Sequence, residues 1–192
     1  LKNQFQSPEW MNKKGFTLSR WWAGVLDGKD GNDKIHNGKT KLKALFVMGN
    51  GITSVAQQAK IKEGLDNLEL LVLADPFVNE AGVLTDKQDD VFLLPAATQF
   101  ETSGSVTATN RSVQWRTQVV EPLYESKPDQ EILFELAKRL GFYDQYTAAL
   151  KNGKDSFTWP EDATREIAKI IKTIGLTGWT PERIKKHTEY SV

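Results

Sequence analysis

The residues with the clearest chemical potential lie in two short segments that directly follow apolar runs. Gly49-Asn50-Gly51 comes after the first run, and Asp75 ends the second. Glycines in such a turn let backbone N–H groups approach a ligand closely, and N–H groups at a helix start attract phosphate. A carboxylate after a second strand can accept a hydrogen bond from a ribose or a base edge. These segments predict a nucleotide site, although a tight turn and a capping residue before Pro76 would give the same pattern without a ligand.

Short apolar runs that alternate with helix-like segments define the elements that must position these residues. The runs Ala44–Met48, Leu70–Leu73 and Val91–Leu94 are typical of strands in a parallel sheet with two buried faces. The predicted fold class is therefore α/β: a Rossmann-like parallel sheet with helices on both faces, plus C-terminal helices. Loops after such strands face one edge of the sheet, where open α/β sheets bind ligands.

Local start and stop signals predict the helices. Ser54 and Gln57 have the spacing of a capping box, so we expect a helix from about Val55 to Asp66. Three later helices are expected, between Pro128 and Gly141, between Pro160 and Gly175, and from Thr180-Pro181 onward. The inward-facing residues of the first two are predicted to be Ile132, Leu133, Leu136, Ala137, Leu140, Ile167, Ile170, Ile171 and Ile174. Before them, Val- and Thr-rich segments on either side of Asn110-Arg111 predict an extended hairpin.

The composition of the 192 residues excludes several classes of site. Lys plus Arg equals Asp plus Glu at 25 each, so there is no general basic field to attract nucleic acid. The sequence has no cysteine, which excludes disulfides, thiolate metal ligands and iron–sulfur ligation by this chain. Its two histidines, His36 and His187, are far apart, so a multi-histidine metal site is excluded as well. No apolar run approaches the length of a membrane span, and we expect no direct membrane insertion.

The sequence divides into three predicted parts. Residues 1–41 are expected to form an N-terminal helix, capped by Ser7, and a polar loop. The three tryptophans of this part, Trp10, Trp21 and Trp22, are expected to pack on a neighbouring domain, with a stacking platform for a ligand as the alternative. Residues 42–141 form the α/β domain, and residues 142–192 a C-terminal helical extension.

Four segments, in order, resemble the large subunit of molybdopterin-dependent oxidoreductases, and formate dehydrogenases most of all. LKALFVMGNG resembles the family's first strand and Gly-rich turn, and LELLVLADPFVNEAG its Asp-x-Phe-x-Thr-Glu-Thr signature. DDVFLLPAATQFETSGSVTATNRSVQWR resembles the family's third strand with its Glu-x-x-Gly-Thr segment, and EPLYESKPDQEILFELAKRLG its Pro-rich turn and following helix. Two departures are Gly51-Ile52 in place of Asn-Pro, and Asn79 in place of the first Thr.

The resemblance implies that residues 42–141 hold one of two molybdopterin guanine dinucleotides on molybdenum or tungsten. The residues implied to contact this cofactor are Gly49, Asn50, Gly51, Asp75, Phe77, Asn79, Glu101, Thr102 and Gly104. Asp75 and Asn79 would bind the guanosine end. The family's cysteine or selenocysteine metal ligand, its catalytic histidine and arginine, and its iron–sulfur cluster would lie outside this chain.

The chain is therefore interpreted as an internal fragment of a formate dehydrogenase catalytic subunit, with no catalytic or metal-ligating residue and no activity of its own. The intact enzyme would oxidise formate to CO2 and pass electrons to iron–sulfur clusters. Implied partners are the other domains of the same subunit and the iron–sulfur and cytochrome b subunits. The implied location is the periplasm, with the cytoplasm as the alternative. The isolated fragment is expected to self-associate or to have a disordered N-terminal segment. Two alternatives remain: a stand-alone nucleotide-binding or regulatory α/β module without redox activity, and a structural domain whose tryptophan-rich start contacts a partner.

Overall fold

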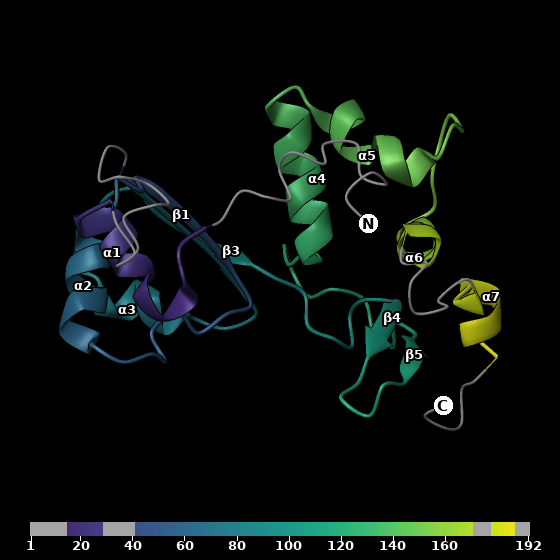
Figure 1. Ribbon diagram of the computed structural model, residues 1–192, viewed down its shortest axis with the longest axis horizontal. Coiled ribbons are helices and arrows are strands. Elements are labelled where there is room, and N and C mark those ends of the chain that lie inside the picture. Colours follow the sequence, from purple (N-terminus) through teal and green to yellow (C-terminus); the bar gives the residue numbers. More distant parts are fainter. Residues whose placement is uncertain (1–14, 29–40, 171–177, 187–192) are drawn as a thin grey trace. The chain divides into compact units, whose positions relative to one another are not determined.

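The computed structural model describes residues 15–28, 41–170 and 178–186, which belong to two compact units. The sheet unit comprises the described residues up to 96 together with 124–129, and the hairpin unit comprises 97–123 and the described residues from 130 onward. Figure 1 follows both along the chain. This division differs from the boundaries predicted at 41/42 and 141/142, because the segment around Trp21 groups with the sheet and residues 97–123 group with the C-terminal helices.

A three-stranded parallel sheet forms the centre of the sheet unit, as predicted. Strands β1 (Ala44–Met48), β2 (Leu70–Asp75) and β3 (Val91–Pro95) follow one another in that order. Val47 pairs with Leu73, and Leu73 with Leu93, so these side chains lie on the same face. The carboxyl ends of all three strands meet at one edge.

The helices of the sheet unit are short. Helix α1 (Trp21–Leu26) follows a 3-10 turn at Leu18–Arg20, α2 (Gln58–Asp66) connects β1 to β2, and α3 (Glu80–Leu84) connects β2 to β3. All three gather beside the sheet in Figure 1. The part of the chain that the structure describes contains no helix long and apolar enough to cross a membrane.

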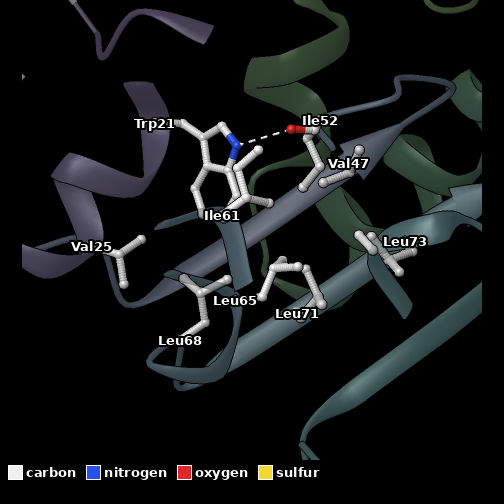
Figure 2. Packing of buried hydrophobic residues seen from close by; sticks show 10 residues of the cluster. Trp21, Val25, Val47, Ile52, Ile61, Leu65, Leu68, Leu71 and Leu73 are labelled. Atoms are coloured by element: carbon white, nitrogen blue, oxygen red, sulfur yellow. Dashed lines mark hydrogen bonds between the residues drawn. The ribbon is translucent and has the colours of Figure 1, made fainter. Parts of the chain in front are cut away.

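The core of the sheet unit lies between these helices and the face of the sheet that carries Leu71 and Leu73. Figure 2 shows it, and its buried members are Trp21, Val25, Val47, Ile52, Ile61, Leu65, Leu68, Leu71, Leu73 and Ala81. Trp21 is 5% exposed within this cluster. The expectation that Trp21 packs on a neighbouring domain, where it would promote self-association, is therefore wrong, because its ring is buried inside its own unit.

The opposite face of the sheet is apolar as well. Phe46, Val72 and Phe92 are in register across the three strands, and the two phenylalanines are 50% and 52% exposed. The α/β class with a parallel sheet and helices is confirmed. The second helical layer expected on this face is not formed by α1, α2 or α3, which pack against the Leu71 and Leu73 side.

The hairpin unit combines a β-hairpin with C-terminal helices. Antiparallel strands β4 (Gly104–Thr107) and β5 (Val113–Arg116) flank Asn110-Arg111, as predicted. The helices that follow are α4 (Asp129–Arg139, whose first residue belongs to the sheet unit), α5 (Tyr143–Lys151), α6 (Glu161–Ile170) and α7 (Pro181–Ile184).

An aromatic cluster, which the sequence did not predict, forms around Phe134 of α4. The ring of Phe134 makes edge-to-face contacts, with centroids 5.6 to 6.0 Å away, with Tyr143, Tyr146, Phe157 and Trp159. Burial of Ala137 is confirmed, but the predictions for Leu140 and Ile167 are wrong, since their side chains are exposed. Predictions for Ser7, Trp10, His36, Ile171, Ile174 and His187 lie outside the described residues.

Candidate functional site

The first predicted segment lies in the loop 49–57, between β1 and α2. The capping box predicted from Ser54 and Gln57 is wrong, because Ser54 Oγ donates to the Gly51 carbonyl oxygen at 2.5 Å and α2 begins later, at Gln58. Gln57 precedes the helix with φ of 70° and no side-chain capping bond. The turn at Gly49–Gly51 is therefore separated from the helix start, and its own backbone is what it offers to a ligand.

Within the described part of the chain, two backbone donors of this turn are unpaired. Gly49 N–H donates to the Ala74 carbonyl oxygen at 3.0 Å, which fixes the turn to the end of β2. Among the described residues, the N–H groups of Asn50 and Gly51 have no hydrogen-bond partner, and both residues are exposed. Gly49 has φ of +56°, and a Cβ placed on it would meet nothing within 4 Å, so the space beside the turn is open. Such donors are suited to an anion.

Asp75 and Asn79 lie together beside this turn. Asn79 Nδ2 donates to Asp75 Oδ2 at 3.2 Å and to the Asn50 carbonyl oxygen at 3.4 Å. Its Oδ1 accepts from Ala81 N–H at 2.9 Å as the N-cap of α3. The other oxygen of Asp75, Oδ1, accepts from Phe77 N–H at 3.2 Å. The structure thus brings three of the predicted site residues, Asn50, Asp75 and Asn79, to the same edge of the sheet.

Phe77 projects from this edge as an exposed ring. Its side chain is 80% exposed, which is far more than a structural role in the core would leave. Phe77 follows Asp75 by two residues, and its backbone N–H donates to that carboxylate, which fixes the Phe77 backbone beside Asp75. The ring is therefore available to a planar or apolar group bound near Asp75.

A second carboxylate, Asp129, was missed by the sequence analysis. A parallel bridge joins Ala96 to Lys127, and Lys127 N–H donates to the Pro95 carbonyl oxygen at 3.1 Å, so this segment continues the sheet beside β3. Asp129 comes directly after it. Partial desolvation, followed by the negative charge of Asp75, raises the pKa of Asp129. No local signal distinguishes Asp129 from an ordinary helix-start acid.

The remaining predicted site residues, Glu101, Thr102 and Gly104, lie in the hairpin unit. Glu101 is 5% exposed, and its two carboxylate oxygens accept from Thr98 N–H at 2.6 Å and Leu123 N–H at 2.8 Å. The bonds from Thr98, then that from Leu123, lower the pKa of Glu101. Its visible role is to fix its own loop.

The other two residues of this group also have partners inside their unit. Thr102 Oγ1 accepts from Arg116 Nη2 at 2.7 Å. Gly104 pairs with Arg116, and a Cβ on it would make ordinary contact with Pro160 at 3.7 Å. A shared pocket of these residues with Asp75 stays a prediction.

The edge of the sheet unit therefore offers unpaired N–H donors, two carboxylates and an exposed ring. N–H donors match phosphate oxygens, and carboxylates match the N–H groups of a base. Within the described ranges there is no group of histidine, cysteine, aspartate and glutamate side chains arranged to hold a metal ion.

The fold and the site do not by themselves identify the protein family, and comparison with known proteins does. Residues 22–139 match the Molybdopterin oxidoreductase family, which covers more than half of the chain. The chain belongs to this family. The matched range contains nearly all of α1, the whole parallel sheet, the hairpin and the whole of α4.

Individual relatives are considerably longer than this chain. It is 36% identical over 162 residues to the "Probable oxidoreductase YjgC" of Bacillus subtilis, covering 73% of this chain and 16% of the relative. It is 31% identical over 176 residues to the "F420-dependent formate dehydrogenase subunit alpha" of Methanocaldococcus jannaschii, covering 89% of this chain and 24% of the relative. For the "Formate dehydrogenase subunit alpha" of Megalodesulfovibrio gigas the identity is 34% over 128 residues, covering 59% of this chain and 12% of the relative. The chain thus spans a quarter or less of each.

A solved structure supports the fold. Acetylene hydratase from Pelobacter acetylenicus superposes with a TM-score of 0.55 at 23% identity, over 86% of this chain and 19% of that one. At this identity the similarity concerns the fold alone.

Proposed function

We propose that this chain supplies a binding site for the guanosine diphosphate part of a molybdopterin guanine dinucleotide. The observation that carries the proposal is the convergence of Asp75, Asn79 and the N–H groups of Asn50 and Gly51, unpaired among the described residues, at one edge of the sheet. Asp129 follows by two residues the bridge that joins Lys127 to Ala96 at the same edge. Membership of the molybdopterin oxidoreductase family supports a molybdopterin cofactor, and the edge supports its guanine dinucleotide form.

The two carboxylates favour guanine over other bases. Guanine presents two adjacent donors, N1–H and the N2 amino group, and a carboxylate accepts both. Asp75 is already oriented by Asn79 and by Phe77 N–H, which leaves each oxygen a further lone pair. Desolvation, followed by the negative charge of Asp75, raises the pKa of Asp129, so a bound donor would relieve the repulsion between the two carboxylates.

The turn 49–51 would hold the phosphates. The N–H groups of Asn50 and Gly51 would donate to phosphate oxygens, and the open space beside Gly49 admits a group close to the backbone. The exposed ring of Phe77 would cover an apolar face of the nucleoside. Roles for Glu101, Thr102 and Gly104 in binding the same cofactor remain part of this proposal.

In the longer protein we propose a formate dehydrogenase catalytic subunit, by similarity to relatives that carry this name. The bound cofactor, with molybdenum or tungsten, would supply the redox chemistry that oxidises formate to CO2. This chain's residues would bind and orient one end of it. Electron transfer to iron–sulfur clusters, association with iron–sulfur and cytochrome b subunits, and a periplasmic location belong to the same proposal. The absence of cysteine means that cluster ligation would fall to other parts of the protein.

Calorimetric titration of the purified chain with GDP, and in parallel with ADP, tests the site. We expect GDP to bind, and Asp75→Asn and Asp129→Asn each to weaken binding by about tenfold or more, since hydrogen bonds to charged groups contribute roughly 1.5–3 kcal/mol. ADP should bind less tightly, because adenine presents an acceptor where guanine presents N1–H.

Asp155→Asn, at an exposed position in the hairpin unit, is the matched control and should leave the affinity for GDP unchanged. Equal binding of GDP and ADP, or GDP binding that survives both substitutions at the edge, would contradict the proposed guanine site. The absence of GDP binding by the wild-type chain would contradict the proposal as a whole.

A further inference from the structure

We propose that Glu80, the first residue of α3, is a positioning residue that holds the loop 49–57 in its binding shape through Thr53. The inference rests on the proposed function of this edge and concerns how its two phosphate donors are kept in place. Glu80 itself would touch neither phosphate nor base.

The central contact is a hydrogen bond between a buried side chain, Thr53, and an exposed one, Glu80, which are far apart in the sequence. Thr53 is 4% exposed, and its Oγ1 donates to Glu80 Oε2 at 2.7 Å. Thr53 lies two residues after Gly51, whose N–H is one of the unpaired donors. A polar side chain buried to this degree depends on its hydrogen-bond partner, so the loop loses its preferred position when the acceptor is removed.

Asn79, the N-cap of α3, also contacts this loop. Asn79 Nδ2 donates to the Asn50 carbonyl oxygen at 3.4 Å, which turns that carbonyl toward α3. The Asn50 carbonyl oxygen also accepts from Ile52 N–H at 3.1 Å. The start of α3 therefore fixes the loop at two points, Asn50 and Thr53, on either side of Gly51.

The remaining contacts hold the loop from other directions. Trp21 Nε1 donates to the Ile52 carbonyl oxygen at 3.3 Å from α1 (Figure 2), and Gln58 Nε2 donates to the Thr53 carbonyl oxygen at 2.5 Å from α2. A loop held from three helices is ordered before a ligand arrives. A preorganised site avoids the entropic cost of ordering on binding, and this is the contribution we ascribe to Glu80.

The test uses three variants of the 192-residue chain. Thr53→Val removes the donor with little change of shape, Glu80→Ala removes the acceptor, and Glu80→Gln removes the charge but keeps an oxygen that can accept. Hydrogen exchange followed by NMR reports on the loop through Ser54 N–H and the Trp21 indole N–H, and on the sheet through Leu73 N–H. GDP affinity is measured in the same samples.

We expect Thr53→Val and Glu80→Ala to accelerate exchange at Ser54 and Trp21 by about tenfold, while Leu73 is unchanged and Glu80→Gln resembles wild type. The affinity for GDP should fall by about three- to tenfold in the first two variants, and the double variant should lose no more than the weaker-binding single one. Equal acceleration at Leu73 would mean global destabilisation and would overturn the inference. So would unchanged exchange in the loop, or a Glu80→Gln variant that behaves like Glu80→Ala.

The two proposals fail separately. If wild-type chain does not bind GDP, the proposed function is wrong, and the exchange pattern alone decides whether Glu80 positions the loop. If GDP binds and its affinity is unaffected while exchange at Ser54 accelerates, the guanosine site stands and the positioning role of Glu80 is wrong.

Discussion

Trp21 Nε1 and the carbonyl oxygen of Ile52 are 3.3 Å apart and form a buried hydrogen bond that joins α1 to the loop 49–57. The ring of Trp21 also packs in the apolar core of the sheet unit. One side chain therefore fixes both the N-terminal helix and the loop that carries the unpaired backbone donors.

Trp21 should stabilise the sheet unit in two ways, through its hydrogen bond and through its buried ring, and two substitutions separate these contributions. Trp21→Phe keeps most of the buried ring but leaves the Ile52 carbonyl oxygen unpaired, and we expect it to lower the free energy of unfolding by about 1–2 kcal/mol. Trp21→Ala should lower it by about 3–5 kcal/mol. Urea denaturation followed by far-UV circular dichroism measures both. Trp22→Phe is the control, because Trp22 Nε1 is buried without a partner among the described residues, so its removal should cost little. A large loss of stability in Trp22→Phe would contradict the explanation.

A glycine in α2 permits the close approach of α1. A Cβ on Gly64 would lie 2.9 Å from Trp22 Cβ and 3.3 Å from the Trp21 ring. Although alanine is the better helix former by about 1 kcal/mol, overpacking typically costs about 1–3 kcal/mol, and we expect the clash to dominate, so that Gly64→Ala lowers the melting temperature. Gly15→Ala, where a Cβ would meet nothing within 4 Å, should leave the melting temperature nearly unchanged. A higher melting temperature for Gly64→Ala would show that the helices separate without cost.

The residue before α2 is under backbone strain. Gln57 adopts φ of 70° and ψ of 53°, a left-handed conformation that disfavours side chains and suits glycine. We expect Gln57→Gly to raise the free energy of unfolding by roughly 0.5–1 kcal/mol, and Gln57→Ala to leave it about the same, since both Gln and Ala carry a Cβ. Chemical denaturation of the three proteins decides between this account and a stabilising contact of the Gln57 side chain, which would make both variants less stable.

Ionised Asp66 stabilises the sheet unit, and this contribution to the free energy of unfolding is lost at acid pH. Its Oδ1 accepts from Thr85 Oγ1 at 2.9 Å and Asp86 N–H at 2.8 Å, and its Oδ2 lies 2.7 Å from Lys62 Nζ. Burial opposes ionisation of Asp66, but the bonds from Lys62, Asp86 and Thr85 outweigh it and lower the pKa below its usual value. Because the folded pKa lies below the unfolded value of about 3.9, the stabilisation is present above that pH and is lost as pH falls through the folded pKa.

The expected result is therefore a pH-dependent difference between wild type and Asp66→Asn. The variant should be less stable at pH 7, and the difference in unfolding free energy should shrink as pH is lowered from 5 towards 2. Asp155→Asn, at an exposed carboxylate, should follow the wild-type pH profile. A difference between wild type and Asp66→Asn that stays constant over this range would show that packing, and not charge, explains the effect of Asp66.

The sequence predicted the parallel sheet because its strands are continuous apolar runs, such as Leu70–Leu73, in which burial alone dictates the pattern. It failed at the loop 49–57, where Ser54 bonds locally to Gly51 and does not cap the helix. Asp129 could not be predicted, since its place near the carboxyl end of β3 depends on the bridge between Ala96 and Lys127. Hydrophobic periodicity does not predict whether a polar side chain bonds to a nearby residue or to one distant in the sequence.

The half-exposed phenylalanines of the sheet, Phe46 and Phe92, have a practical consequence for every stability assay described above. Fluorescent dyes that brighten on apolar surfaces will bind this face in the folded chain, so their signal starts high and rises little on melting. Unfolding curves recorded with such dyes would understate the cooperativity of the transition. Intrinsic fluorescence of the buried Trp21, or circular dichroism, reports the folded population without this background.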